Sequence, residues 1–218
     1  MGWNQPEPWT LAIVISAGLA IWAHDPERIV LHWVFKPLTT VLLALLLLAM
    51  APPTSTRHWF MVGLGLSLVG DVALMMPARW FRFGLLSFLL ALLAYAVAFS
   101  QEVPLTLRQL AFLLLPLAVG ALVLRSLWRT PQMGRLRWFA IAYLGAMGLM
   151  VWRVLSRFEG PQVDFAAWIW GCVGAALFML ADGLLANRRF AKKEIPYVLE
   201  LGCYYLAQYC LVVSVWMA

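Results

Sequence analysis

Charged residues are scarce in this chain. Asp, Glu, Lys and Arg make up 12% of its 218 residues, whereas soluble domains carry about 25%. Apolar residues account for 64% of the chain and occur in successive runs of about 20 residues, the length that one helix needs to cross a bilayer. This composition excludes a soluble globular protein. We expect an all-α bundle of about eight transmembrane helices that forms one integral-membrane domain over residues 1–218.

Cysteine is scarce as well. Cys172, Cys203 and Cys210 all lie inside apolar runs, none belongs to a CxxC pair, and no histidine is close to them in the sequence. This pattern supports neither a disulfide framework nor a zinc site. We therefore expect no metal and no cofactor.

Eight apolar segments follow one another, at about residues 9–23, 33–51, 59–76, 83–99, 107–128, 138–155, 165–186 and 196–217. The first is preceded by Glu7 and by no Lys or Arg, so it lacks the positive start of a secretory signal peptide, and we expect it to be retained. Pro37 suits the first turn of the second helix, where a missing N–H costs nothing.

The formal net charge is +6, but the basic residues lie in short loops between the apolar segments, so we expect no nucleic-acid partner. The first, third, fifth and seventh loops, with Lys36 included, hold 12 of the 16 Lys and Arg residues. The second, fourth and sixth loops hold the other four, which are Arg57, Arg108, Arg153 and Arg157. Because cytoplasmic loops carry the excess of Lys and Arg, we predict that both termini face the outer compartment. We interpret Arg153 and Arg157 as interfacial anchors. The short loops fit a bacterial inner membrane.

Two aspartates lie inside apolar segments, Asp71 in the third and Asp182 in the seventh. An ionisable residue within a membrane is costly, and it tends to face a protein interior and to mark a functional site. Each is about five residues from the cytoplasmic end of its segment, which places both about 8 Å below that surface at about 1.5 Å per residue. We predict that they share one layer of the bundle. Taken singly, either could merely bond a neighbouring hydroxyl.

A polar stripe runs along the last segment, because Tyr197, Glu200, Tyr204 and Gln208 follow one another at helical spacing. The stripe starts at the cytoplasmic end, and Lys36 enters from the same side. A polar pocket that opens towards the cytoplasmic leaflet is our hypothesis. Two simpler interpretations stay open: Lys36 as an interfacial lysine, and Glu200 as a partner of loop lysines.

The two aspartates lie in similar short sequences. Gly70-Asp71-x-x-Leu74 followed by Arg82-Phe83 matches Ala181-Asp182-x-x-Leu185 followed by Arg189-Phe190. The match predicts a weak four-plus-four helical repeat, in which the aspartates are equivalent.

Several motifs occur in a fixed order: Lys36-Pro37-Leu38-Thr39-Thr40, Gly70-Asp71-Val72-Ala73-Leu74-Met75, Gly84-Leu85-Leu86-Ser87-Phe88 with Tyr95 and Phe99, Gly174-Ala175 with Phe178, Ala181-Asp182, Ala186 and Arg189-Phe190, and Tyr204-Tyr205-Leu206-Ala207-Gln208. In these motifs the chain resembles the YhhN-like lysoplasmalogenase family of multi-spanning membrane proteins over about residues 33–214. The resemblance implies hydrolysis of the vinyl (alkenyl) ether bond of a lysoplasmalogen, a lysophospholipid substrate within the bilayer. The products would be a fatty aldehyde and glycerophosphocholine or glycerophosphoethanolamine.

Two carboxyl groups suit that reaction. A vinyl ether is hydrolysed by protonation of its β-carbon and attack of water on the resulting oxocarbenium ion, so an acid and a base are needed. Two carboxyls in one buried site cannot both ionise easily, so one can donate a proton while the other stays charged. We predict Asp71 and Asp182 as the catalytic pair, and the sequence leaves open which is the acid.

Seven further residues are predicted to bind the substrate. Lys36, Arg82 or Arg189 would meet its phosphate, and the remaining candidates are Tyr95, Glu200, Tyr204 and Gln208. Tyr95 and Gln208 could instead only join helices.

Two other classes of protein stay open. A proton- or cation-coupled transporter of small solutes would also place acids within the membrane. A non-catalytic lipid-binding protein would not need two acids at one depth. The sequence does not define an oligomeric state.

Overall fold

The structure is a computed structural model that describes residues 5–128, 136–160, 163–190 and 194–218. These residues form eight α-helices and four short 3-10 helices and include no strand, which confirms the all-α prediction. The α-helices are α1 (Pro6–Trp22), α2 (Ile29–Met50), α3 (Ser55–Met75), α4 (Phe81–Ser100), α5 (Leu114–Trp128), α6 (Leu136–Ser156), α7 (Phe165–Phe190) and α8 (Tyr197–Trp216). The 3-10 helices are η1 (Pro26–Arg28), η2 (Ala78–Trp80), η3 (Leu107–Leu113) and η5 (Arg157–Glu159).

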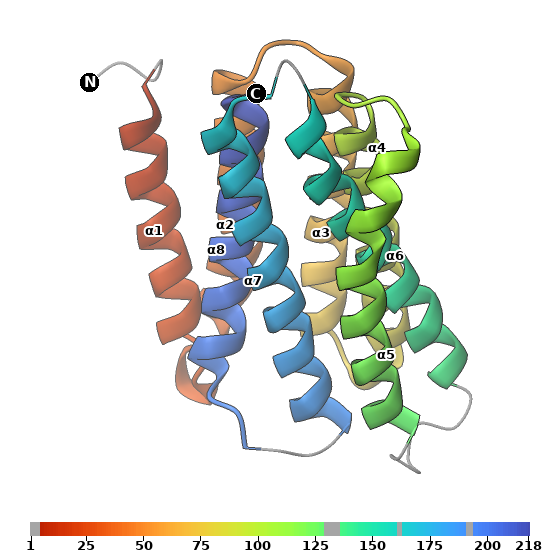
Figure 1. Cartoon of the computed structure of the whole chain (residues 1–218). Helices are drawn as coiled ribbons and strands as arrows, with labels where there is room; N and C mark the ends of the chain where they lie inside the picture. The colour runs from red at the N-terminus through yellow and green to blue at the C-terminus, as the bar shows by residue number, and fades with distance from the viewer. Residues whose placement is uncertain (1–4, 129–135, 161–162, 191–193) are drawn as a thin grey trace.

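Seven helical segments of the described chain are long and apolar enough to cross a membrane, so the protein is a multi-pass membrane protein. The eighth helix, α1, has 17 residues and extends over about 25 Å, a little less than the apolar core of a bilayer. It packs beside α2 and α8 and runs along the same bundle. α1 begins at the end of the bundle where α8 finishes (Figure 1).

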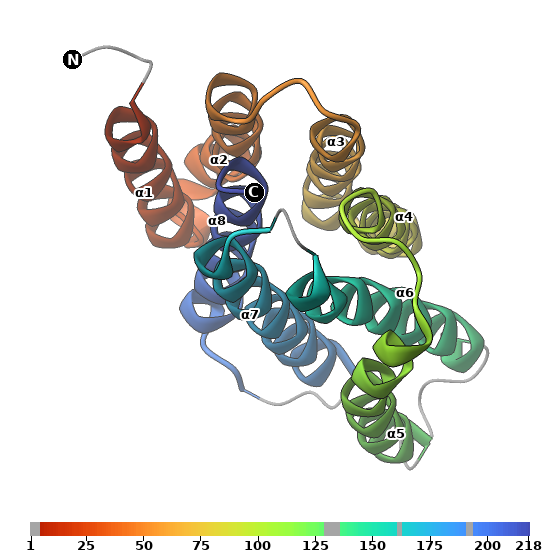
Figure 2. The same ribbon diagram turned by 45° about the horizontal axis from the view of Figure 1, so that its top comes forward.

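The helices pack mainly as antiparallel neighbours, and the closest pairs are α3 with α4 and α7 with α8. α2 contacts α3 and α8, and α6 contacts α4 and α7, so α8 lies between α2 and α7 (Figure 2). α8 is the most buried span and α5 the least, because α5 packs on α6 at the outer edge of the bundle. The four-plus-four repeat stays a prediction.

Glycines allow the close approach of α3 to α4 and of α7 to α8. A Cβ atom on Gly70 would lie 2.7 Å from the ring of Phe88, and one on Gly174 would lie 2.9 Å from the backbone nitrogen of Leu211. Small residues at helix contacts are typical of membrane bundles, because little apolar driving force exists between helices in lipid. These contacts hold α3, which carries Asp71, against α4, and α7, which carries Asp182, against α8.

Three predicted helix boundaries are wrong. Pro37 lies inside α2 and not in its first turn, because the apolar residues from Ile29 onward already form helix. The fifth segment is divided into η3 and α5, since Pro116 has no N–H for the carbonyl of Phe112 and its ring crowds that carbonyl. α7 continues to Phe190, so Asp182 is farther from its helix end than Asp71 is from the end of α3.

The interpretation of Arg153 and Arg157 as interfacial anchors is also wrong, because each is only 1% exposed. Arg157 pairs with Glu102 and donates to the carbonyl of Ser214 on α8 (2.8 Å). Arg153 donates to the side chain of Gln109 in η3 (3.0 Å) and to the carbonyl of Val103. The two guanidinium groups thus fasten the chain between α4 and α5 to α6 and α8. Burial raises the pKa of Glu102, although Arg157 favours its charged form.

The described basic residues of the predicted cytoplasmic loops lie at the end of the bundle where α1, α3, α5 and α7 finish, opposite to the end of Arg157 (Figure 1). Arg129, Arg135, Lys192 and Lys193, which the charge count also uses, lie outside the described residues. We refer to this end as the basic end.

Candidate active site

Asp71 lies on α3 near the basic end and is 1% exposed. Its Oδ2 accepts hydrogen bonds from the hydroxyl of Thr40 (2.8 Å) and from the hydroxyl of Tyr204 (3.0 Å). The Nζ of Lys36 is 3.7 Å from its Oδ1. Lys36 and Thr40 are one turn apart on α2 and therefore face α3 together. A carboxylate buried this deeply is stable only with such partners.

A second layer of hydrogen bonds lies deeper in the bundle and holds Tyr204 in place. The amide nitrogen of Gln208 donates to the hydroxyl oxygens of Tyr204 (3.4 Å) and Ser67 (3.1 Å). Tyr95 donates to the amide oxygen of Gln208 (2.9 Å). Tyr95 and Gln208 are fully buried, so the structure brings these predicted residues to Asp71 as supports of Tyr204.

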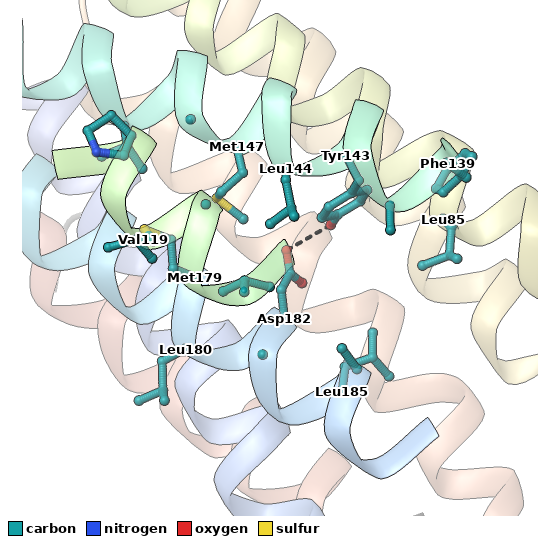
Figure 3. Close-up of a pocket in the computed structure, with 18 of the residues that line it drawn as sticks. Leu85, Val119, Phe139, Tyr143, Leu144, Met147, Met179, Leu180, Asp182 and Leu185 are labelled. Atoms are coloured by element: carbon teal, nitrogen blue, oxygen red, sulfur yellow. Dashed lines mark hydrogen bonds between the residues drawn. The ribbon is translucent and has the colours of Figure 1, made fainter. Parts of the chain in front are cut away.

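Asp182 lies on α7 and has different surroundings. Its Oδ2 accepts a hydrogen bond from the hydroxyl of Tyr143 on α6 (2.8 Å), and its other oxygen points away from that tyrosine (Figure 3). No ion pair among the described residues includes Asp182. Within the described part of the chain, Asp71 thus has a cation and two hydroxyl donors as partners, and Asp182 has a single hydroxyl donor.

Both aspartates line one small cavity of about 40 Å³ in the bundle. We call it the central cavity; its lining includes Lys36, Asp71, Phe88, Asp182, Glu200 and Tyr204. The aspartates meet there although α7 extends farther past its aspartate than α3 does. The helices thus bring together two carboxyl groups that are 111 positions apart in the sequence.

A larger cavity of about 490 Å³, which we call the polar cavity, lies at the basic end. Its polar lining residues are His24, His32, Lys36, Arg188, Arg189, Tyr197 and Glu200. Glu200 accepts two hydrogen bonds from the guanidinium of Arg188 (2.6 and 2.8 Å). Because Lys36 and Glu200 line both cavities, the polar cavity adjoins the central one.

His24 packs at the edge of the polar cavity with its ring stacked on Tyr197 (3.3 Å between centroids). Much of His24 is exposed, but the partial burial of its ring, with His32 and two nearby cations as smaller causes, lowers its pKa to about 4. At neutral pH this imidazole is therefore uncharged, and the positive charge at the cavity comes from Lys36, Arg188 and Arg189.

A third cavity of about 350 Å³, the apolar cavity, lies between α4, α5, α6 and α7 (Figure 3). Its lining is almost entirely aliphatic or aromatic and includes Leu85, Val119, Phe139, Leu144, Met147 and Met179. Asp182 and Leu185 line both the apolar and the central cavity. Asp182 therefore lies where an apolar space meets the two-carboxyl space.

The two arginines predicted to bind phosphate lie in different places. Arg189 lines the polar cavity, and its guanidinium lies 4.6 Å from the ring centre of Phe81. Arg82 is exposed in the first turn of α4 and lines none of the three cavities. The structure therefore does not bring Arg82 to the site.

The sequence prediction of the site missed Thr40, Tyr143 and Arg188, and it also missed the two histidines of the polar cavity, His24 and His32. Thr40 had a signal, because it follows Lys36 by one helical turn. Tyr143 is a lone hydroxyl in an apolar run, and nothing in its spacing indicates Asp182 as its partner. Arg188 resembled a loop charge and was missed because α7 is longer than predicted.

Among the residues described, no cluster of three or more His, Cys, Asp or Glu side chains could hold a metal ion. The chemistry available at the site is that of two carboxyl groups, a lysine and tyrosine hydroxyls. These groups can transfer protons and stabilise a nearby cation or anion.

The fold and the site define a multi-pass helical membrane protein with two aspartates that line one cavity, beside a polar and an apolar cavity. A model of the YhhN family matches residues 31–215, so the chain belongs to the YhhN family. It is 27% identical over 212 residues to the membrane protein YhhN of Escherichia coli O157:H7 and of Shigella flexneri, and the match covers 95% of this chain and 98% of each relative. No solved structure matches the chain. The resemblance drawn from the motifs is thus confirmed at the level of the family.

Proposed function

We propose that the protein is a lysoplasmalogenase that hydrolyses the vinyl ether bond of lysoplasmalogens within the membrane. The observation that supports this most directly is that three cavities of different chemical character adjoin one another. Asp182 lines the apolar space and the two-carboxyl space, Lys36 and Glu200 line the two-carboxyl space and the cationic space, and Leu185 lines all three. The alkenyl chain, the vinyl ether and the phosphate head group of a lysoplasmalogen match these three kinds of space.

The apolar cavity would hold the alkenyl chain. It lies beside α5, the span with the largest lipid-exposed share, so a lipid could reach it from the bilayer. Chain burial there would supply about 0.8 kcal/mol per CH₂ group relative to water. The substrate already resides in lipid, however, so this cavity would mainly orient the chain.

The polar cavity would hold the head group. Arg189 and Lys36 would meet the phosphate, since a guanidinium forms charge-assisted hydrogen bonds to phosphate oxygens. Glu200 keeps Arg188 oriented at the same wall through its two hydrogen bonds. We further propose that this end faces the cytoplasm, in keeping with the Lys and Arg excess there, and that both termini face the outer compartment.

The central cavity would hold the vinyl ether against Asp71 and Asp182. One carboxyl would protonate the alkenyl carbon, and the other would stabilise the oxocarbenium ion and accept a proton from water. Tyr204, supported by Tyr95 and Gln208, would keep Asp71 aimed at this space. The reaction consumes one water and requires no redox partner.

A solute carrier remains the competing function. Carriers commonly place their sites at interrupted helices, whose ends coordinate the solute. Through Asp71 and Asp182, however, α3 and α7 are continuous helices. This continuity favours the hydrolase, and solute uptake by proteoliposomes without release of aldehyde would favour the carrier.

The test is an assay of fatty aldehyde release by the purified protein in lipid nanodiscs with lysoplasmalogen as substrate. Asp71→Asn and Asp182→Asn should each lower turnover about 10²- to 10⁴-fold, the usual contribution of a general acid or base. Asp25→Asn, at an exposed residue of the same end of the protein, is the matched control and should retain activity. Undiminished turnover in Asp71→Asn or in Asp182→Asn would contradict the paired-acid mechanism.

A further inference from the structure

Asp71 and Asp182 line one cavity, but their partners differ in a way that divides the two catalytic roles. The Asp71 carboxylate has a cation and two hydroxyl donors, all of which stabilise its negative charge. Among the residues that the structure describes, Asp182 has one donor, Tyr143, and it lies at the edge of the apolar cavity. We propose that Asp182, positioned by Tyr143, is the proton donor and that Asp71, paired with Lys36, is the ionised partner. This assignment rests on the proposed function.

The charged groups around the central cavity agree with this assignment. Four groups that can carry charge line that cavity besides Asp182: Lys36, Asp71, Glu200 and Tyr204. Lys36 is paired with Asp71, and Glu200 is bound by Arg188. Lys36, which lines this cavity, and Arg188, which binds Glu200, are thus already matched to other carboxylates, and an ionised Asp182 would have no counter-ion in the lining of the cavity. Asp182 is the carboxyl group that remains neutral.

The position of Asp182 also matches the atom that must be protonated. In a vinyl ether the β-carbon is the first carbon on the chain side, and the α-carbon carries the ether oxygen on the head-group side. Asp182 borders the apolar cavity, where the chain would lie. Asp71 lies beside Lys36, which also lines the polar cavity. The donor therefore faces the β-carbon, and the ionised partner faces the α-carbon.

The proton transfers balance in three steps. Asp182 gives its proton to the β-carbon, which breaks the carbon–carbon π bond and leaves an oxocarbenium ion and an Asp182 carboxylate. Water adds to the α-carbon and gives a proton to Asp71, which forms a hemiacetal. The bond from the α-carbon to the glycerol oxygen then breaks, Asp71 returns its proton to that oxygen, and the hemiacetal hydroxyl gives its proton to Asp182. Aldehyde and glycerol hydroxyl are released, and both aspartates regain their starting states.

Tyr143 is a positioning residue in this scheme. Its hydroxyl occupies Oδ2 of Asp182 and leaves the other oxygen, which points away from Tyr143 in Figure 3, to hold the proton. Tyr143 lines the apolar cavity next to Leu144 and Met147, so it fixes the carboxyl at the chain-side wall. Without this hydrogen bond the carboxyl could rotate away from the β-carbon.

Infrared difference spectroscopy on the protein in nanodiscs at neutral pH tests the assignment without relying on activity. Wild type minus Asp182→Asn should contain the C=O band of a protonated carboxylic acid. Wild type minus Asp71→Asn should contain carboxylate bands but no band of a protonated carboxylic acid, and the same holds for the control difference with the exposed Asp164→Asn. A carboxylic acid band that is lost in Asp71→Asn, or only carboxylate bands lost in Asp182→Asn, would overturn the proposal.

Tyr143→Phe provides a second measurement that does not depend on folding of the Asp182 variant. It should shift the frequency of the carboxylic acid band without removing it, and it should lower kcat more than it raises KM. A band that does not move would contradict the role of Tyr143. Failure of the proposed function is distinguishable, because the wild type would then release no aldehyde, whichever aspartate carries the band.

Discussion

Two groups of buried charges lie at opposite ends of the bundle. At the basic end Lys36 pairs with Asp71, and at the other end Arg157 pairs with Glu102. Both pairs are joined to several helices by hydrogen bonds, but the lining of the three cavities includes only the first. Arg153 and Arg157 are packed on all sides by protein. A buried charge within a membrane protein thus indicates a functional site only where a cavity gives a ligand access to it.

The largest expected effect is a difference in turnover between variants of the Lys36–Asp71 pair and of the Arg157–Glu102 pair. Glu102→Gln should release aldehyde at the wild-type rate per folded molecule, whereas Asp71→Asn should lose about 10²- to 10⁴-fold. The reason is that Glu102 fastens helices and borders none of the three cavities. Rates normalised to folded protein by size-exclusion chromatography check this, and a loss of turnover in Glu102→Gln equal to that in Asp71→Asn would remove the distinction.

The second prediction compares two arginines of the basic end. Arg189→Gln should raise KM about tenfold, which corresponds to the loss of about 1.4 kcal/mol of phosphate binding. Arg82→Gln is the matched control and should leave KM unchanged, because Arg82 lines none of the cavities. Initial rates over a range of lysoplasmalogen concentrations give both values. Equal effects of the two variants would place the head group elsewhere.

The third prediction concerns the apolar cavity. A Cβ atom on Gly120 would meet open space, and Gly120 lines this cavity, so Gly120→Phe should reduce the room for a chain. We expect kcat/KM to fall a few-fold more for long-chain than for short-chain substrates, since each lost CH₂ contact changes binding by up to about 0.8 kcal/mol. Gly65→Phe, at an exposed and equally open position on α3, should show no chain-length effect. If kcat/KM depended on chain length in the same way in both variants, the result would contradict a binding site for the alkenyl chain in the apolar cavity.

The smallest expected effect is a pH dependence of the free energy of unfolding that comes from Glu102, at the end of the bundle opposite to the basic end. The folded state holds the Glu102 proton more tightly than the unfolded state, because burial raises its pKa above the ordinary value of 4.5. The folded state therefore binds more protons between the two pKa values, and the free energy of unfolding should fall as pH rises through that window. Glu102→Gln should remove this slope in unfolding experiments, and an unchanged slope in the variant would contradict its origin.

Much of the fold could be predicted from the sequence, because each transmembrane helix is a long apolar run between polar breaks. Asp71 and Asp182 could be singled out for the same reason, since each stands alone in such a run. The partners of these aspartates could not be predicted equally well. Tyr143 belongs to no periodic pattern of polar residues. Arg188 lies within α7 because that helix continues to Phe190, and the point where a helix ends depends on tertiary packing. Arg153 and Arg157 were misjudged because hydropathy cannot distinguish a buried, hydrogen-bonded arginine from one at the membrane surface.

The central claim is protonation of an alkenyl carbon by a carboxyl group within the helical bundle, and hydrolysis in D₂O tests it most directly. The aldehyde released from lysoplasmalogen by the wild-type protein, reduced at once to the alcohol and analysed by mass spectrometry, should carry one deuterium on the carbon next to the former carbonyl. Asp182→Asn should yield no labelled product above the uncatalysed background. Aldehyde without this deuterium, or no aldehyde from the wild type, would contradict the account.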